Sequence, residues 1–219
     1  MNNSKGLAAL FTAVSETDFL HLDLSVNNTE ISNLDLSSPE KHWEYITHLL
    51  HKKRKTIAYG GYLEQRNLYK HNDLFQEKEY PRNIHLGIDF WVAENTPVLA
   101  PFDGVVHSFA NNSAPGDYGP TIVLAHEDKG DTFYTLYGHL TIESLAGLVI
   151  GKIIRKGEQF TSIGAPLING GYAPHLHFQI IRAIGTYKGD YPGVCCAKEA
   201  AYYAVNCPDP VSYLTAELE

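Results

Sequence analysis

Hydrophobic and polar positions follow different patterns in the two parts of the chain. From residue 83 onward, short runs alternate between apolar and polar residues, and glycine- or proline-bearing turns separate most of them. A period of two is typical of β-strands that bury one face. The pattern predicts strands over 84–92, 97–100, 103–110, 120–126, 132–139, 158–163 and 175–183, and a short helix over 142–148.

The first 80 residues carry a helical signal instead. Ser38-Pro39-Glu40 predicts a helix start, with serine as N-cap, proline in the first turn and an acid near the positive end of the helix. The basic run 52–55 falls where cations complement the helix dipole, which favours a solvated helix terminus over a nucleic-acid patch. Apolar residues follow the start at helical spacing, at Trp43, Ile46, Leu49 and Leu50.

These patterns predict a mainly β protein, α+β overall. We expect a compact antiparallel sheet, sandwich-like or barrel-like, preceded by a helical N-terminal region. The predicted division places the helical region at 1–80 and the β domain, with a C-terminal extension, at 81–219.

Composition narrows the classes of partner. The 219-residue chain is 44% hydrophobic and 19% charged, which is ordinary for a globular protein. Its formal charge of −8 argues against nucleic acid or an anionic membrane as the main partner. No run approaches the length of a membrane span, and the N-terminus makes a poor signal peptide. The three cysteines form no even-numbered disulfide framework, so we expect a cytoplasmic protein, with a periplasmic or extracellular one as the alternative.

Four histidines and one aspartate within the β region carry the candidate chemistry. His85 and Asp89 are four residues apart, and His175 and His177 are two apart, so on strands each pair faces one side. His139 lies in a strand-like segment between them. Gly87 suits a strand that another group approaches closely.

This set of side chains suits a catalytic zinc site. Such sites use three protein ligands and leave one position for water. A single carboxylate neutralises one of the two metal charges, and the remaining charge lowers the pKa of bound water toward neutrality. The residues alone leave open which imidazole of the 175/177 pair binds the metal.

Three motifs in order resemble the LytM/lysostaphin-type zinc endopeptidases, the duplicated-hybrid-motif peptidases. They are His85-Leu86-Gly87-Ile88-Asp89, Tyr137-Gly138-His139-Leu140 and His175-Leu176-His177-Phe178. The resemblance runs from about residue 83 to 182. The later segments 189–194 and 207–210 resemble a subgroup associated with kinase-like and aminotransferase-like domains. Before the third motif, segment 165–174 is bulkier than the small stretch usual in the family.

The resemblance implies a role for each motif residue. His85, Asp89 and His177 would bind Zn²⁺, and His175 would be the general base that activates the zinc-bound water. His139 would orient or stabilise the developing tetrahedral intermediate. The implied activity is a zinc metalloendopeptidase that hydrolyses peptidoglycan-type peptides, either glycine-containing or from stems and cross-bridges, by zinc-activated water.

Several alternatives stay open at this stage. One is a cytosolic zinc amide hydrolase, and another is a non-catalytic zinc-containing binding or regulatory module. An upstream polar residue, Asn67 or Asn72, is a candidate to occupy the open zinc position in a latent form. We expect His107 and His126 to be satisfied locally, and we assign no role to the histidines before residue 80. The oligomeric state is left open.

Overall fold

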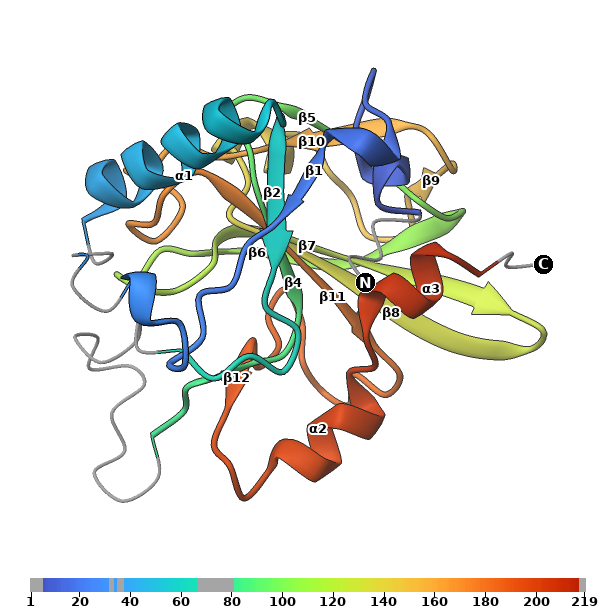
Figure 1. Ribbon diagram of the computed structural model, residues 1–219. Helices are drawn as coiled ribbons and strands as arrows, with labels where there is room; N and C mark the ends of the chain where they lie inside the picture. The colour runs from blue at the N-terminus through green and yellow to red at the C-terminus, as the bar shows by residue number, and fades with distance from the viewer. Residues whose placement is uncertain (1–5, 32–33, 35–37, 67–80, 217–219) are drawn as a thin grey trace.

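An eight-stranded β-sheet forms the centre of the computed structural model, which describes residues 6–31, 34, 38–66 and 81–216 (Figure 1). Two smaller sheets have two strands each. The strands are β1 Phe19–His21, β2 Ile57–Gly60, β3 Ile84–His85, β4 Ile88–Trp91, β5 Pro97–Leu99, β6 Gly104–Asn112, β7 Gly119–Asp128, β8 Asp131–Gly138, β9 Ile153–Ile154, β10 Gln159–Ser162, β11 His175–Ile181 and β12 Val194–Cys195.

The order of strands in the large sheet is β1-β2-β4-β11-β8-β7-β6-β9. Neighbours are antiparallel except β1 and β2, which are parallel. The predicted mainly β fold is confirmed. Within the described residues β1 and β9 occupy opposite edges of this sheet, so it is open and does not close into a barrel.

The helices are short apart from one. The α-helices are α1 Pro39–Lys53, α2 Ala200–Asn206 and α3 Pro210–Leu214, and 3₁₀ helices include η1 Leu7–Leu10, η2 Glu16–Asp18, η3 Thr29–Ile31 and η6 Ile142–Leu145. The helix predicted over 142–148 is therefore only the 3₁₀ turn η6, and α2 and α3 were not predicted. None of the helices in the described part of the chain combines the length and apolar character that a membrane crossing requires.

Helix α1 begins where the sequence predicts. The Ser38 hydroxyl accepts a hydrogen bond from the Lys41 backbone N–H, and Arg54 ends the helix in the left-handed conformation. Ile46 and Leu50 on its buried face pack in one cluster with Trp91 of β4. The helix is therefore fixed against the sheet strand that carries one of the candidate site residues.

The predicted strand 84–92 is interrupted at residues 86 and 87. Its first part, β3, pairs with β12, whereas β4 joins the large sheet between β2 and β11. A Cβ on Gly87 would lie 2.7 Å from the Phe178 carbonyl oxygen and 2.8 Å from His177 Cε1. The expected close approach at Gly87 is thus present, and the chain bends there because no side chain fills the space.

Two strands of the large sheet come from the N-terminal region. β2 pairs with β4 in a register that sets Gly60 opposite Asp89, and β1 pairs with β2. The helical prediction for residues 1–80 missed these strands, because all four residues of β2 are buried and show no alternation. The boundary near residue 80 stays a prediction, although one continuous sheet crosses it.

Candidate metal centre and its pocket

Three side chains on neighbouring strands converge on one point. His85 Nε2 and His177 Nδ1 are 2.9 Å apart, and each lies 3.2 Å from Asp89 Oδ1. All three residues are at most 3% exposed. Strand pairing sets this geometry, because His177 of β11 lies directly opposite Asp89 of β4, and the bend at Gly87 brings His85 over both.

The ring nitrogens of His85 and His177 that face away from the cluster contact other groups of the protein at hydrogen-bond distance. His85 Nδ1 donates to the Gly61 carbonyl oxygen at 2.9 Å, and His177 Nε2 lies 2.9 Å from Gln179 Oε1. Gln179 Nε2 donates to the Pro192 carbonyl and to Cys207 Sγ, which turns its oxygen toward His177. Both imidazoles therefore carry their proton on the outer nitrogen and direct a lone pair at the cluster.

This donor set fits a metal ion. Two imidazole lone pairs and a carboxylate oxygen repel one another at 2.9–3.2 Å unless a positive charge lies between them. Tetrahedral zinc with bonds of about 2.0–2.1 Å separates its ligand atoms by about 3.3 Å, close to what is found here. The three residues form a group able to hold a metal ion.

A buried arginine holds the second oxygen of Asp89. Arg66 Nη1 lies 2.5 Å from Asp89 Oδ2, and Arg66 Nε lies 2.5 Å from Glu64 Oε2. Arg66 is 1% exposed and lies over the Trp91 ring. The carboxylate is thus divided, with Oδ1 facing the two imidazoles and Oδ2 bound to the guanidinium.

Burial and neighbouring charge keep His85 and Asp89 in their metal-binding forms. Burial lowers the pKa of His85 to about 4, so the imidazole is neutral at pH 7. Burial alone would raise the pKa of Asp89, but the imidazolium that His85 becomes below its own pKa and the guanidinium of Arg66 hold the pKa of Asp89 well below its usual range. Neutral imidazoles and an ionised carboxylate are the states that metal ligation needs.

His175 and His139 lie next to the cluster with their ring centroids 4.1 Å apart. His175 Nδ1 donates to the Ala173 carbonyl and His139 Nδ1 to the Asn169 carbonyl, both at 2.7 Å. Each ring therefore keeps an unprotonated Nε2, and His175 Nε2 lies 3.9 Å from Asp89 Oδ1. Burial lowers the pKa of both, that of His139 strongly.

His139 has a backbone conformation that few non-glycine residues adopt. It follows the last residue of β8 with φ of 63°, in the left-handed region, and its N–H donates to the Tyr118 carbonyl at 2.8 Å. Left-handed backbone at a non-glycine residue persists only where the surroundings enforce it, and such residues gather at functional sites.

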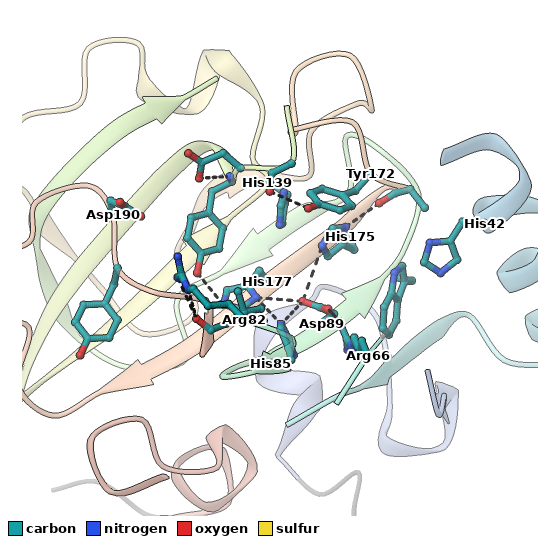
Figure 2. A pocket seen from close by; sticks show the side chains of 18 residues that line it. His42, Arg66, Arg82, His85, Asp89, His139, Tyr172, His175, His177 and Asp190 are labelled. Carbon is teal, nitrogen blue, oxygen red and sulfur yellow. Dashed lines mark hydrogen bonds and ion pairs between the residues drawn. The ribbon is translucent and has the colours of Figure 1, made fainter. Parts of the chain in front are cut away.

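One pocket contains all five predicted residues (Figure 2). Trp91 stacks on His175, and Tyr172 contacts both His139 and His175 edge-on. The Tyr118 hydroxyl lies 3.4 Å from His177 Nε2. Charged side chains of Arg82, Asp117 and Asp190 also line the pocket.

Several residues that line the pocket or contact its histidines were missed in the sequence. Gln179 had a signal, since it continues the alternation of His175 and His177 on β11. His42 lines the pocket although we assigned it no role; its spacing of four from Ile46 places it on the apolar face of α1. Arg66 had no local signal. Asn67 and Asn72 lie outside the described residues.

His126 has the local partners we expected. It is hydrogen-bonded to the Asp103 carbonyl and to Thr135 Oγ1, away from the pocket. His107 packs on Tyr134 and contacts Ser108.

Two histidines and one carboxylate, with further imidazoles around an accessible pocket, form the donor set of catalytic metal sites in hydrolases. The model of peptidase family M23 matches residues 83–189, which include all five site residues. The chain is 34% identical over 120 residues to an uncharacterised metalloprotease of Haemophilus influenzae, covering 53% of this chain and 23% of that protein. It is 32% identical over 116 residues to the peptidoglycan DD-endopeptidase ShyA of Vibrio cholerae, covering 49% of this chain and 23% of that protein.

Among solved structures, the catalytic domain of lysostaphin from Staphylococcus simulans is similar, with a TM-score of 0.45 and 22% identity over 72% of this chain and 89% of that one. Residues 83–189 match the model of peptidase family M23, and the resemblance inferred from the motifs is confirmed. It matches about a quarter of the length of the two curated relatives. Helix α1, strand β2 and Arg66 lie outside the matched residues.

Proposed function

We propose that this protein is a zinc-dependent metallopeptidase that hydrolyses peptide bonds in peptidoglycan-type peptides. The observation that carries the proposal is the convergence of His85 Nε2, Asp89 Oδ1 and His177 Nδ1 within 2.9–3.2 Å in a pocket that holds two further imidazoles. The family M23 domain and the metalloprotease and endopeptidase relatives support the same reading.

His85, Asp89 and His177 would hold Zn²⁺. Once bound, the ion would supply a Lewis acid that polarises the scissile carbonyl and lowers the pKa of water. Arg66 keeps Asp89 Oδ2 occupied, so the carboxylate presents Oδ1 alone to the cluster. Gly61 and Gln179 hold the imidazoles in the tautomers that ligation needs.

His175 fits the role of general base. Its Nδ1–H is held by the Ala173 carbonyl, so Nε2 is the atom that takes a proton from the attacking water. The same nitrogen then carries that proton to the amine that leaves the cleaved bond. Stacking on Trp91 fixes the plane of the ring during both transfers.

His139 fits the role of orienting the water. Its Nδ1–H is held by the Asn169 carbonyl, and burial keeps the ring neutral, so Nε2 accepts a hydrogen bond and does not donate one. Of the two roles that the resemblance implies for His139, orientation therefore agrees better with this tautomer than donation to a developing oxyanion.

Peptidoglycan peptides are the proposed substrate class because three curated relatives in Neisseria are named DD-carboxypeptidase/endopeptidase Mpg and the Vibrio cholerae relative is a peptidoglycan DD-endopeptidase. The pocket also carries charges of both signs, from Arg82, Asp117 and Asp190, which suits substrates with amine and carboxylate groups.

The test is a cleavage assay with products read by mass. Zinc-loaded wild-type protein, His175→Ala and the control His107→Ala are each incubated with cross-linked muropeptides and with oligoglycine. We expect cleavage by the wild type and by His107→Ala, and a loss of at least a hundredfold in His175→Ala. No cleavage by a wild-type protein that retains zinc would contradict the peptidase and favour a module that binds without cutting.

A further inference from the structure

His42 is a buried polar residue whose hydrogen-bonding capacity is not fully used within the described residues. It lies on the inner face of α1, is 3% exposed, and its Nε2 has no hydrogen-bond partner within the described part of the chain. Burial, followed by the charge that His175 carries when protonated and by that of Arg66, lowers the pKa of His42 to about 3, so the ring is neutral at pH 7. A buried polar atom without a partner costs stability, and a native protein that keeps one needs a reason to do so.

The position of His42 supplies that reason. It lines the same pocket as His175 (Figure 2). Its ring centroid lies 6.1 Å from that of Trp91, which in turn stacks on His175. Trp91 and Ala173 pack with α1 in one apolar cluster, so this end of the pocket has apolar walls. His42 Nε2 is a hydrogen-bonding atom set among them.

We propose that His42 is a substrate-binding residue: its Nε2 forms a hydrogen bond with a main-chain amide of the bound peptide, in a subsite formed with Trp91 and Ala173. This inference rests on the proposed peptidase function and assigns to the N-terminal helix one wall of the substrate site. A subsite with the apolar walls of Trp91 and Ala173 and a hydrogen-bonding nitrogen suits a peptide segment with a small apolar side chain. A bound main-chain group would give Nε2 the partner that it lacks.

Substitution of His42 by phenylalanine separates binding from packing. His42→Phe keeps an aromatic ring beside Trp91 but removes the hydrogen-bonding nitrogen. The matched control is His48→Phe, at an exposed histidine on the same helix. On whichever cross-linked muropeptide or oligoglycine the wild type cleaves, we expect KM to rise about tenfold in His42→Phe, as the loss of one hydrogen bond predicts. We expect kcat and zinc content to stay within twofold, and thermal stability not to fall. A KM within twofold of the wild-type value would overturn the proposal.

A second readout does not depend on cleavage. The zinc-loaded His175→Ala protein, labelled with ¹⁵N in its histidine rings, is titrated with the same muropeptides and oligoglycine, and the His42 signals are assigned by their loss in His42→Phe. A shift of the His42 Nε2 resonance on peptide addition supports the subsite even if no peptide is cleaved, in which case only the peptidase proposal fails. No shift with any of these peptides overturns the subsite, and it does so whether or not the wild type cleaves.

Discussion

At the scale of single residues, the site depends on atoms that face away from it. Gly61 and Gln179 fix the imidazole tautomers, and Arg66 fixes the carboxylate of Asp89. Each of these contacts excludes another tautomer or orientation of the side chain that it holds. The three ligand atoms therefore point at one position before a metal ion binds.

Arg66 gives the clearest prediction at this scale. Arg66→Met leaves Asp89 as a buried charge without its cation, because both members of the pair are nearly inaccessible. We expect metal-free Arg66→Met to lose about 3 kcal/mol of unfolding free energy, measured by urea denaturation. The control Arg155→Met breaks an exposed pair with Asp103, with side chains 68% and 63% exposed, and should change stability by less than about 1 kcal/mol. Equal effects of the two substitutions would contradict this account of Arg66.

At the scale of elements, the metal centre forms where three strands meet. β4 and β11 pair directly, and the bend between β3 and β4 turns His85 onto them. On β11 the alternation sends His175 and His177 to the pocket and places Gln179 behind His177, while Leu176 and Phe178 enter the core. The bend at Gly87 is the part of this arrangement that is most sensitive to substitution.

Gly87→Ala tests the bend. The added methyl group would meet the Phe178 carbonyl and the His177 ring at under 3 Å, so His177 must move. We expect zinc affinity, measured by competition with a chromophoric chelator, to fall about 10- to 100-fold. Gly130→Ala is the control, since its Cβ meets nothing within 4 Å and only the positive φ is strained. Unchanged zinc affinity in Gly87→Ala would contradict the role assigned to the close approach at Gly87.

The elements that the sequence predicted share a local cause. Ser38 caps α1, and in β11 the residues that face the pocket alternate with those that face the core. Both signals lie within short stretches of the chain, so they can be found in the sequence. β1 and β2 escaped prediction because they are short and, in β2, buried on both faces. His85, Asp89, His175 and His177 were predictable because they sit on strands, and His139 because it belongs to the motif at the end of β8. Arg66 and His42 were not, because only tertiary packing brings the N-terminal region against β4 and the pocket.

At the scale of the whole molecule, buried neutral histidines make stability depend on pH. Burial lowers the pKa of His126 to about 4, compared with about 6.5 in an unfolded chain. Between these two values the unfolded chain binds a proton that the folded protein excludes, so stability falls as pH falls through this window and levels off below it. His42 and His85, whose pKa values are lowered to about 3 and about 4, act with the same sign.

We expect metal-free protein to lose unfolding free energy steadily from pH 7 to pH 4, with His126 contributing on the order of 3 kcal/mol. In His126→Gln the slope over this range should be correspondingly shallower, whatever its stability at pH 7. Urea denaturation at closely spaced pH values measures both slopes. Parallel curves for the wild type and His126→Gln would contradict the assigned contribution.

The central claim is that one zinc ion at His85, Asp89 and His177 makes this chain a peptidase. The most direct measurement is a titration of Zn²⁺ into metal-free protein while cleavage of a cross-linked muropeptide is followed by mass. We predict that the rate rises in proportion to added zinc and stops rising at one equivalent, and that His177→Ala shows no rise. Cleavage that is already complete without zinc, or absent at one bound equivalent, would contradict the claim.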